Sequence, residues 1–151
     1  MGSILEYKHL GKSGLKVSPL CLGTMLFGRE TPSQESQLII ESARSSGINF
    51  IDTADAYVGG DSERLVGRCI KTSRDHWVLA TKLANKMGQG PNKAGLSRKW
   101  VMQACEESLR RLRTDYIDIY YLHKEDHATP LRETIMAMGD LIKDGKIRYF
   151  G

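Results

Sequence analysis

The chain has 151 residues, 40% of them hydrophobic and 26% charged, which is enough for one domain with a substantial core and too short for two large ones. The formal net charge is +4, but basic residues are interspersed with acidic ones and lack aromatic neighbours, which excludes an obvious nucleic-acid partner. Three widely spaced cysteines, Cys21, Cys69 and Cys105, argue against a disulfide framework or a zinc site and indicate a reducing, cytoplasmic setting. No signal peptide is visible at residues 1–6 and no apolar run could span a membrane, so we expect no membrane partner.

The first third of the chain predicts a hairpin, a strand and a helix. Residues 7–10 and 15–18 flank a glycine-bounded turn, a pattern typical of a β-hairpin. Residues 20–24 form a short apolar run that indicates a buried strand. A helix is predicted from the Thr-Pro-Ser sequence at 31–33 to Gly47. Its expected apolar face consists of Leu38, Ile39, Ile40 and Ala43.

The same order of strand and helix then repeats to the end of the chain. Strands are predicted at 50–53, 77–82, 116–123 and from 147 onward, separated by helices at 62–71, 97–113 and 129–145. In the last helix we expect Thr129 as the N-cap and Pro130 as the first helical residue. The basic cluster at 109–113 falls where a helix should end, a position that favours cations. This alternation predicts a parallel sheet, either an open doubly wound sheet or part of a (β/α)₈ barrel, and local pattern does not choose between them.

Polar residues end several of these strands. Thr24, Asp52, Lys82 and His123 each close an apolar run, and Tyr57 follows Asp52 in the next loop. Taken singly, each has an ordinary explanation as a turn cap, a solvated side chain, a loop aromatic or a core histidine. However, the carboxyl ends of parallel strands lie on one face of the sheet, where ligand sites form. The set therefore predicts an acid, a phenol, an amine and an imidazole around one site.

This set fits acid–base chemistry at a carbonyl group. A tyrosine is a poor proton donor near neutrality, but an adjacent ammonium favours its phenolate, and a carboxylate can hold that ammonium in place. A neutral histidine can donate a hydrogen bond to a carbonyl oxygen. Carbonyl reduction also requires a hydride, which no side chain supplies, so a cofactor is implied. The sequence lacks the glycine-rich fingerprint of a Rossmann dinucleotide site and the common metalloprotease and P-loop motifs.

Seven segments in chain order carry a resemblance to a known family. They are Gly-Leu-Lys-Val-Ser at 14–18, Leu-Gly-Thr-Met at 22–25, Asn-Phe-Ile-Asp-Thr-Ala-Asp-Ala-Tyr at 49–57, Asp-Ser-Glu at 61–63, Ala-Thr-Lys at 80–82, Leu-Arg-Arg-Leu-Arg-Thr-Asp-Tyr-Ile-Asp at 109–118 and Gly-Lys-Ile-Arg-Tyr-Phe-Gly at 145–151. As a set they resemble the aldo-keto reductases, and most of all the branch that includes bacterial general reductases and potassium-channel β subunits. The resemblance covers the whole chain.

The resemblance implies a fold and an activity. The fold is α/β: the amino-terminal half of a (β/α)₈ TIM barrel, preceded by a β-hairpin that caps the barrel bottom. The activity is reduction of an aldehyde or ketone with NADPH and without a metal. The implied catalytic residues are Asp52, Tyr57, Lys82 and His123, with Tyr57 as proton donor. The implied neighbours of the nicotinamide are Gly23, Thr24, Met25 and Asp52.

The resemblance also implies a protein of about twice this length. We therefore expect residues 1–151 to form a single partial barrel domain that stops as the fifth barrel strand begins, with an incomplete NADP(H) site. Two exposed sheet edges would favour self-association. The alternative function is a non-catalytic half-barrel that serves as a subunit or interaction module.

Overall fold

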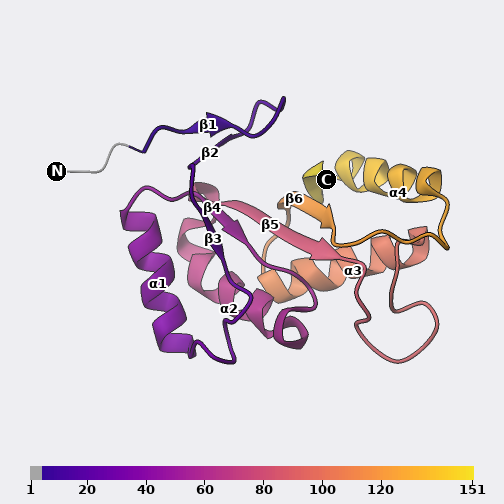
Figure 1. Ribbon diagram of the computed structural model, residues 1–151, viewed down its shortest axis with the longest axis horizontal. Coiled ribbons are helices and arrows are strands. Elements are labelled where there is room, and N and C mark those ends of the chain that lie inside the picture. Colours follow the sequence, from indigo (N-terminus) through magenta and orange to yellow (C-terminus); the bar gives the residue numbers. More distant parts are fainter. Residues whose placement is uncertain (1–4) are drawn as a thin grey trace.

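A computed structural model describes residues 5–151, and its central element is a five-stranded parallel sheet (Figure 1). The strands pair in chain order and are β3 (Cys21–Gly23), β4 (Phe50–Asp52), β5 (Val78–Leu83), β6 (Ile117–Leu122) and β7 (Ile147–Phe150). The helices between them are α1 (Ser33–Ser45), α2 (Asp61–Ile70), α3 (Arg98–Leu112) and α4 (Leu131–Lys143), with two 3₁₀ segments, η1 (Tyr57–Gly60) and η2 (Lys71–His76). A separate antiparallel hairpin, β1 (Lys8–His9) and β2 (Lys16–Val17), precedes the sheet.

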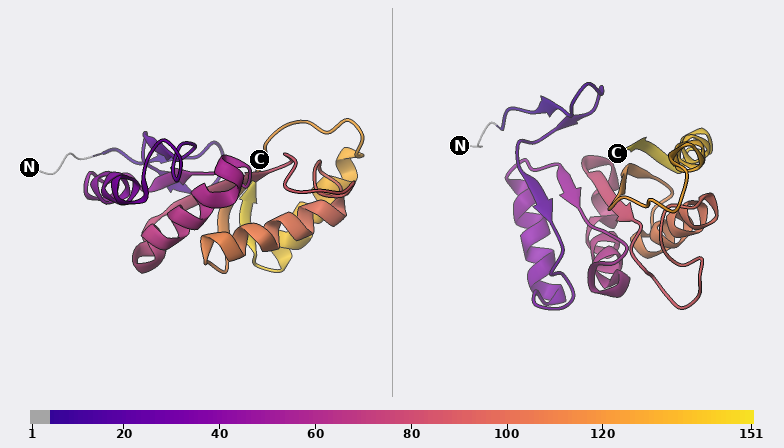
Figure 2. Two further views of the ribbon diagram at one scale, coloured as in Figure 1. Left: turned by 90° about the horizontal axis from the view of Figure 1, so that it is seen from below. Right: turned by 45° about the vertical axis from the view of Figure 1, so that its right-hand side comes forward.

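The strand order decides between the two architectures that the sequence left open. A doubly wound sheet reverses its direction of growth at a switch point, whereas each strand here is added next to the preceding one. The helices likewise pack in succession, α1 on α2, α2 on α3 and α3 on α4, and follow one another in an arc along the sheet (Figures 1 and 2). This arrangement is consistent with half of a (β/α)₈ barrel, the fold that the family resemblance implied.

Two hydrophobic clusters pack against the two faces of the sheet. The larger one lies between the strands and the helices and contains Ile51, Leu79, Trp100 and Leu141, all fully buried. The smaller one lies on the opposite face and joins Val17 of the hairpin to strand residues that include Val78, Ala80 and Ile119. Burial of these side chains is the main driving force for assembly.

The hairpin lies at the amino-terminal ends of the strands. Asn49, directly before β4, accepts a hydrogen bond at Oδ1 from the Ser18 backbone and donates from Nδ2 to the Lys16 carbonyl. These bonds fix the hairpin at the start of the strands, away from the carboxyl ends where ligands bind in such folds. The sequence pattern predicted the hairpin, and the family resemblance implied its place at the bottom of the barrel.

Two details of the helices were predicted wrongly. Leu38 was assigned to the apolar face of α1, but it is 65% exposed, and Ile40 and Ala43 are the buried apolar residues of this helix. Thr129 was expected to cap α4. Instead its hydroxyl donates to Asp126 Oδ2, Pro130 occupies the N-cap position without a side-chain cap, and the helix begins one residue later. A local loop bond has therefore replaced the expected cap.

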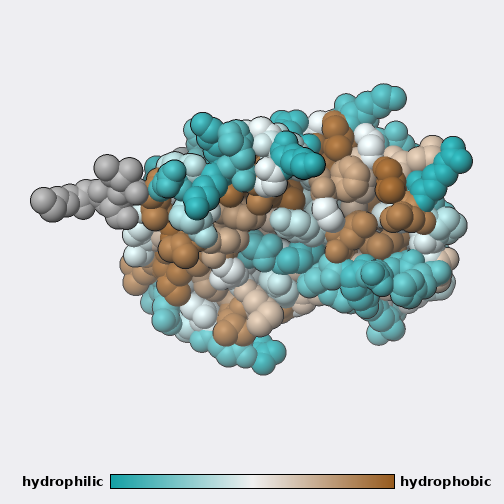
Figure 3. Space-filling model, turned by 45° about the horizontal axis from the view of Figure 1, so that its top comes forward, coloured by the Kyte–Doolittle hydropathy of each residue, from teal (hydrophilic) through white to brown (hydrophobic). Residues whose placement is uncertain are grey.

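The outer strands of the five-stranded sheet are β3 and β7. Apolar side chains are exposed on or beside both strands, including Leu20 and Met25 near β3 and Tyr149 and Phe150 on β7. Figure 3 shows apolar patches separated by hydrophilic side chains on the face that it presents. Self-association through these edges stays a prediction. None of the helices within residues 5–151 has the length and apolar character needed to cross a membrane.

A close crossing of α2 and α3 gives the first test of this packing. A Cβ at Gly67 would lie 2.2 Å from the Leu112 carbonyl oxygen, so Gly67→Ala must push the two helices apart. We expect a loss of roughly 2 kcal/mol or more in the free energy of unfolding, measured by urea titration. Gly139→Ala is the matched control: it lies in α4 with no atom within 4 Å of the added Cβ, and should stabilise by about 1 kcal/mol. Equal effects of the two substitutions would contradict the close crossing.

Candidate active site

The Lys82 ammonium is the centre of the candidate site. Its Nζ donates to Asp52 Oδ2 at 2.6 Å, to the Thr53 carbonyl at 2.8 Å and to the Tyr57 hydroxyl at 2.9 Å. The parallel register pairs Asp52 with Ala80, so the Asp52 and Lys82 side chains point to the same face of the sheet. Both side chains are largely buried, at 24% and 15% exposure. Three of the four predicted catalytic residues thus meet at one nitrogen atom.

Tyr57 reaches this site from a strained turn. It begins η1, and the next residue, Val58, has φ 49° and ψ 40°. A β-branched residue seldom adopts this left-handed conformation, and such strain often accompanies functional sites. The Tyr57 amide donates to the Ala54 carbonyl, which closes the turn directly after β4. This turn places the Tyr57 hydroxyl at the carboxyl end of the sheet, beside Lys82.

His123 completes the predicted set from β6. Its amide donates to the Leu83 carbonyl, which extends the β5–β6 pairing by one residue and fixes the backbone. The imidazole lies edge-on to the Tyr57 ring, with centroids 5.9 Å apart and planes 82° to each other. Burial lowers the pKa of His123, and the nearby Lys82 ammonium lowers it further, which favours the neutral ring.

The structure also places residues that the sequence prediction did not include. Asn85 Nδ2 lies 3.1 Å from His123 Nδ1, and the Thr53 carbonyl is the third acceptor of the Lys82 ammonium. Asn85 follows a predicted strand by three residues, and no motif marked it. A main-chain carbonyl leaves no side-chain signal at all.

The predicted nicotinamide neighbours differ in their surroundings. Gly23 ends β3 opposite Asp52, and a Cβ added there would meet nothing within 4 Å. Met25 is 58% exposed. Thr24 is buried, and its hydroxyl is already bonded to the Asp52 carbonyl and to Ser62 Oγ, so its observed bonds are structural. Gly23 and Met25 are exposed and Asp52 is partly exposed, so all three leave surface accessible.

Behind the site, a buried ionic network ties α2 to α3 and β5. The Glu63 carboxylate accepts from Arg111 Nε at 2.5 Å and from Thr81 Oγ1 at 2.6 Å. Arg111 belongs to the basic cluster that the sequence placed simply at a helix end, so that interpretation was incomplete. Asp55 is fully buried nearby, and within residues 5–151 no side chain donates a hydrogen bond to its carboxyl oxygens. Burial, reinforced by the negative charge of Glu63, raises the pKa of Asp55 to about 7.

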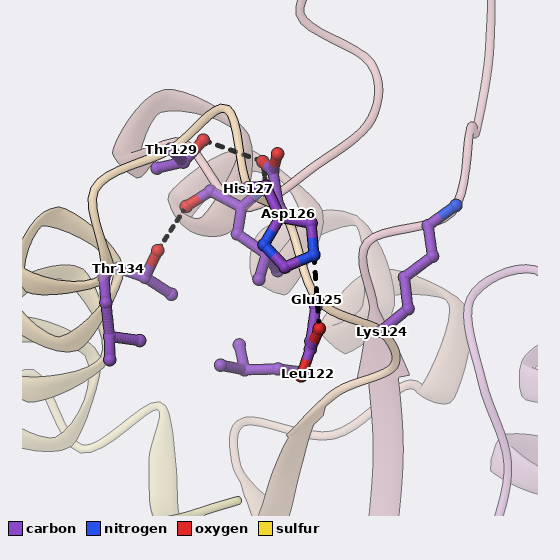
Figure 4. Close-up of a pocket in the computed structure, with 9 residues that line it drawn as sticks. Leu122, Lys124, Glu125, Asp126, His127, Thr129 and Thr134 are labelled. Carbon is purple, nitrogen blue, oxygen red and sulfur yellow. Dashed lines mark hydrogen bonds and ion pairs between the residues drawn. The ribbon is translucent and has the colours of Figure 1, made fainter.

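A cavity of about 580 Å³ lies beneath the loop that follows His123 (Figure 4). Its wall combines apolar residues such as Leu96 and Leu131 with Asp126, which accepts from Thr129. His127 and Glu125, which also line it and lie 3.3 Å apart, are almost fully exposed, at 89% and 86%. The Asp52, Tyr57, Lys82 and His123 side chains do not line this cavity. Converging, largely buried ionisable groups therefore mark the Lys82 site as the better candidate.

Within residues 5–151, no cluster of histidine, cysteine and carboxylate side chains could hold a metal ion. The fold and the site together define a class of barrel protein with an aspartate, a tyrosine, a lysine and a histidine at the carboxyl ends of its strands. Comparison with known proteins identifies that class: the model of the Aldo/keto reductase family matches residues 19–151. The chain belongs to the aldo/keto reductase family.

Individual relatives agree with this assignment. A probable voltage-gated potassium channel subunit beta of Arabidopsis thaliana is 40% identical over 97% of this chain and 46% of its own length. The corresponding protein of Oryza sativa subsp. japonica is 39% identical over the same shares. The solved structure of aldo-keto reductase AKR11C1 from Bacillus halodurans (holo form) is 40% identical, with a TM-score of 0.89 over 97% of this chain and 49% of that one. The chain thus spans about half the length of the relatives it matches.

Asp55 gives a test of the electrostatics behind the site. Its pKa is about 7 in the folded protein and near 3.8 ordinarily, so the folded state keeps a proton that the unfolded state loses. This contribution to stability is full below pH 3.8 and is lost as the pH rises towards 7. Asn has no carboxyl group to ionise, so we expect Asp55→Asn to abolish this loss of stability at higher pH. The free energy of unfolding of the variant minus that of wild type should therefore be roughly 2–4 kcal/mol larger at pH 7.5 than at pH 4, measured by denaturant titration.

The exposed Asp75 supplies the control for this measurement. Asp75→Asn should give the same stability difference from wild type at both pH values. A stability difference for Asp55→Asn that does not change with pH would show that the Asp55 carboxyl ionises normally in the folded protein.

Proposed function

We propose that this chain provides the acid–base half of an NADPH-dependent carbonyl reductase that converts aldehydes or ketones to alcohols. The observation that supports the proposal most directly is the contact of one ammonium, Lys82, with both a carboxylate and a phenol. A phenol with a cationic neighbour can give a proton to an oxygen atom that becomes more negative during reduction.

Each of the four residues has a distinct role in this proposal. Because Lys82 donates to the Tyr57 oxygen, the phenolic proton is free to be donated to a substrate oxygen. The ammonium then stabilises the phenolate that remains, and Asp52 holds the ammonium in position. His123, whose lowered pKa favours the neutral ring, donates a hydrogen bond that orients the carbonyl group. The carbonyl carbon gains a hydride and the oxygen gains the Tyr57 proton, which together give the alcohol.

The residues beside the site fit a nicotinamide cofactor. A reduced nicotinamide, when bound, supplies the hydride that no side chain can provide. Gly23 allows close approach of a flat ring beside Asp52, and the exposed Met25 offers an apolar contact. We assign Gly23, Met25 and Asp52 to this contact and give Thr24 a supporting role through its bonds to the Asp52 carbonyl and Ser62. Residues outside this chain would complete the NADP(H) site.

The similarity to proteins named as potassium channel β subunits supports a second candidate, a non-catalytic interaction module. The two candidates differ in what the Lys82 site must do. A reductase requires an intact Tyr57 hydroxyl, whereas a module that only binds a partner does not. The next experiment therefore separates them.

Tyr57→Phe removes the proposed proton donor and keeps the aromatic ring. In the intact protein we expect the rate of aldehyde reduction by NADPH to fall by at least ~10²-fold, followed as NADPH absorbance. Tyr116→Phe is the control, because Tyr116 lies between the guanidinium groups of Arg74 and Arg148 at the opposite end of the sheet. It should leave the rate unchanged. An unchanged rate in Tyr57→Phe would remove Tyr57 from the proton-donor role.

Gly23→Val tests the proposed position of the nicotinamide. The new side chain would project into open space beside Asp52, so the fold should tolerate it while the cofactor loses its contact surface. We expect the Kd for NADPH to rise at least tenfold, a change of about 1.4 kcal/mol, in a fluorescence titration of the intact protein. Gly14→Val, in the hairpin turn and equally free of close contacts, should bind NADPH like wild type. Equal affinities of the two variants would argue against a nicotinamide at Gly23.

A further inference from the structure

His123 carries one chemical ambiguity that decides whether it can act as proposed. A neutral imidazole has one N–H nitrogen and one acceptor nitrogen, and the partner of one ring nitrogen determines which is which. The Asn85 amide nitrogen lies 3.1 Å from His123 Nδ1. An amide NH₂ group can only donate, so Nδ1 is the acceptor and Nε2 carries the hydrogen.

The backbone holds Asn85 in this position. The residue before it, Ala84, is fully buried with φ 123°, a conformation that side-chain-bearing residues rarely adopt. Its carbonyl accepts from the Gly95 amide at 2.9 Å, which anchors the strained turn to the following loop. On the partner strand, the His123 amide donates to the Leu83 carbonyl. Asn85 and His123 are therefore fixed relative to each other by bonds that involve neither side chain.

We propose that Asn85 is a positioning residue that holds His123 as the Nε2–H tautomer, which leaves Nε2 as the hydrogen-bond donor to a substrate carbonyl. Only the identity of the hydrogen-bond acceptor, a substrate carbonyl oxygen, rests on the reductase function proposed above. The tautomer itself follows from the geometry of Asn85 and His123. Asn85 does not contact the reacting atoms and acts through His123.

The charges around His123 support a neutral ring. Burial lowers the pKa of His123 most, the Lys82 and Lys124 charges lower it further, and Asp52 alone raises it. The Tyr57 ring lies against the imidazole. A neutral Nε2–H can donate to a carbonyl oxygen without adding a second cation beside the Lys82 ammonium. Asn85 contributes a neutral donor, whereas a carboxylate in its place would attract a proton to Nδ1.

The experiment is nitrogen NMR of the intact protein labelled with ¹⁵N-histidine, with the His123 signals assigned by their loss in His123→Gln. In wild type we expect the Nε2–H tautomer at pH 8. In Asn85→Asp, an acceptor of the same size, we expect the Nδ1–H tautomer and a raised His123 pKa. Asn92→Asp makes the same chemical change in an exposed loop and should leave the His123 spectrum unchanged.

The activity of Asn85→Asp provides a second readout that a merely structural role would not produce. At pH 8 we expect kcat for aldehyde reduction to fall at least tenfold. It should recover towards pH 6, where the protonated ring again donates from Nε2. A fall in kcat that is the same at every pH would contradict this role.

An Nδ1–H tautomer in wild type, or a His123 spectrum that Asn85→Asp does not alter, overturns the inference even if the protein is an active reductase. If wild type reduces no carbonyl compound, the proposed function fails, but the NMR result still decides the tautomer. The two failures are therefore distinguishable.

Discussion

The ammonium of Lys82 is the interaction on which the rest of the site depends. Removing a cation from water is costly unless it is paired, and Lys82 is 15% exposed with three oxygen acceptors at hydrogen-bond distance. Those acceptors come from β4 and the turn after it, so the register of β4 against β5 must be correct. A slip of one residue would turn the Asp52 side chain to the opposite face. Strand pairing and charge pairing therefore support each other.

The layer of helices supplies the rigidity that the site requires. Strained backbone at Val58 and Ala84 adjoins two of the residues that orient the site, Tyr57 and Asn85. Such conformations persist only where the surroundings over-determine them. The close crossing at Gly67 and the buried pair of Glu63 with Arg111 provide that rigidity on the helical side of the sheet. Stability of the helical layer and geometry of the site are thus linked.

The predicted site residues that the structure brings together are those whose chemistry stands out at a strand end. Asp52, Lys82 and His123 each interrupt an apolar run, and the structure brings them together with Tyr57. Their catalytic roles stay predictions. Neither Asn85 nor the Thr53 carbonyl could be found this way, because an asparagine in a loop and a main-chain carbonyl resemble many others in sequence.

The sequence by itself determined the alternation of strands and helices and the residue types at the strand ends, because both depend on local periodicity. Only the tertiary structure decided that the strands pair in chain order as half of a barrel, since strand order depends on contacts between distant segments. It also decided that Leu38 is exposed and that Arg111 pairs with the buried Glu63. A helix pattern predicts which residues share a face, but only the packing of neighbouring elements determines how much of that face is covered.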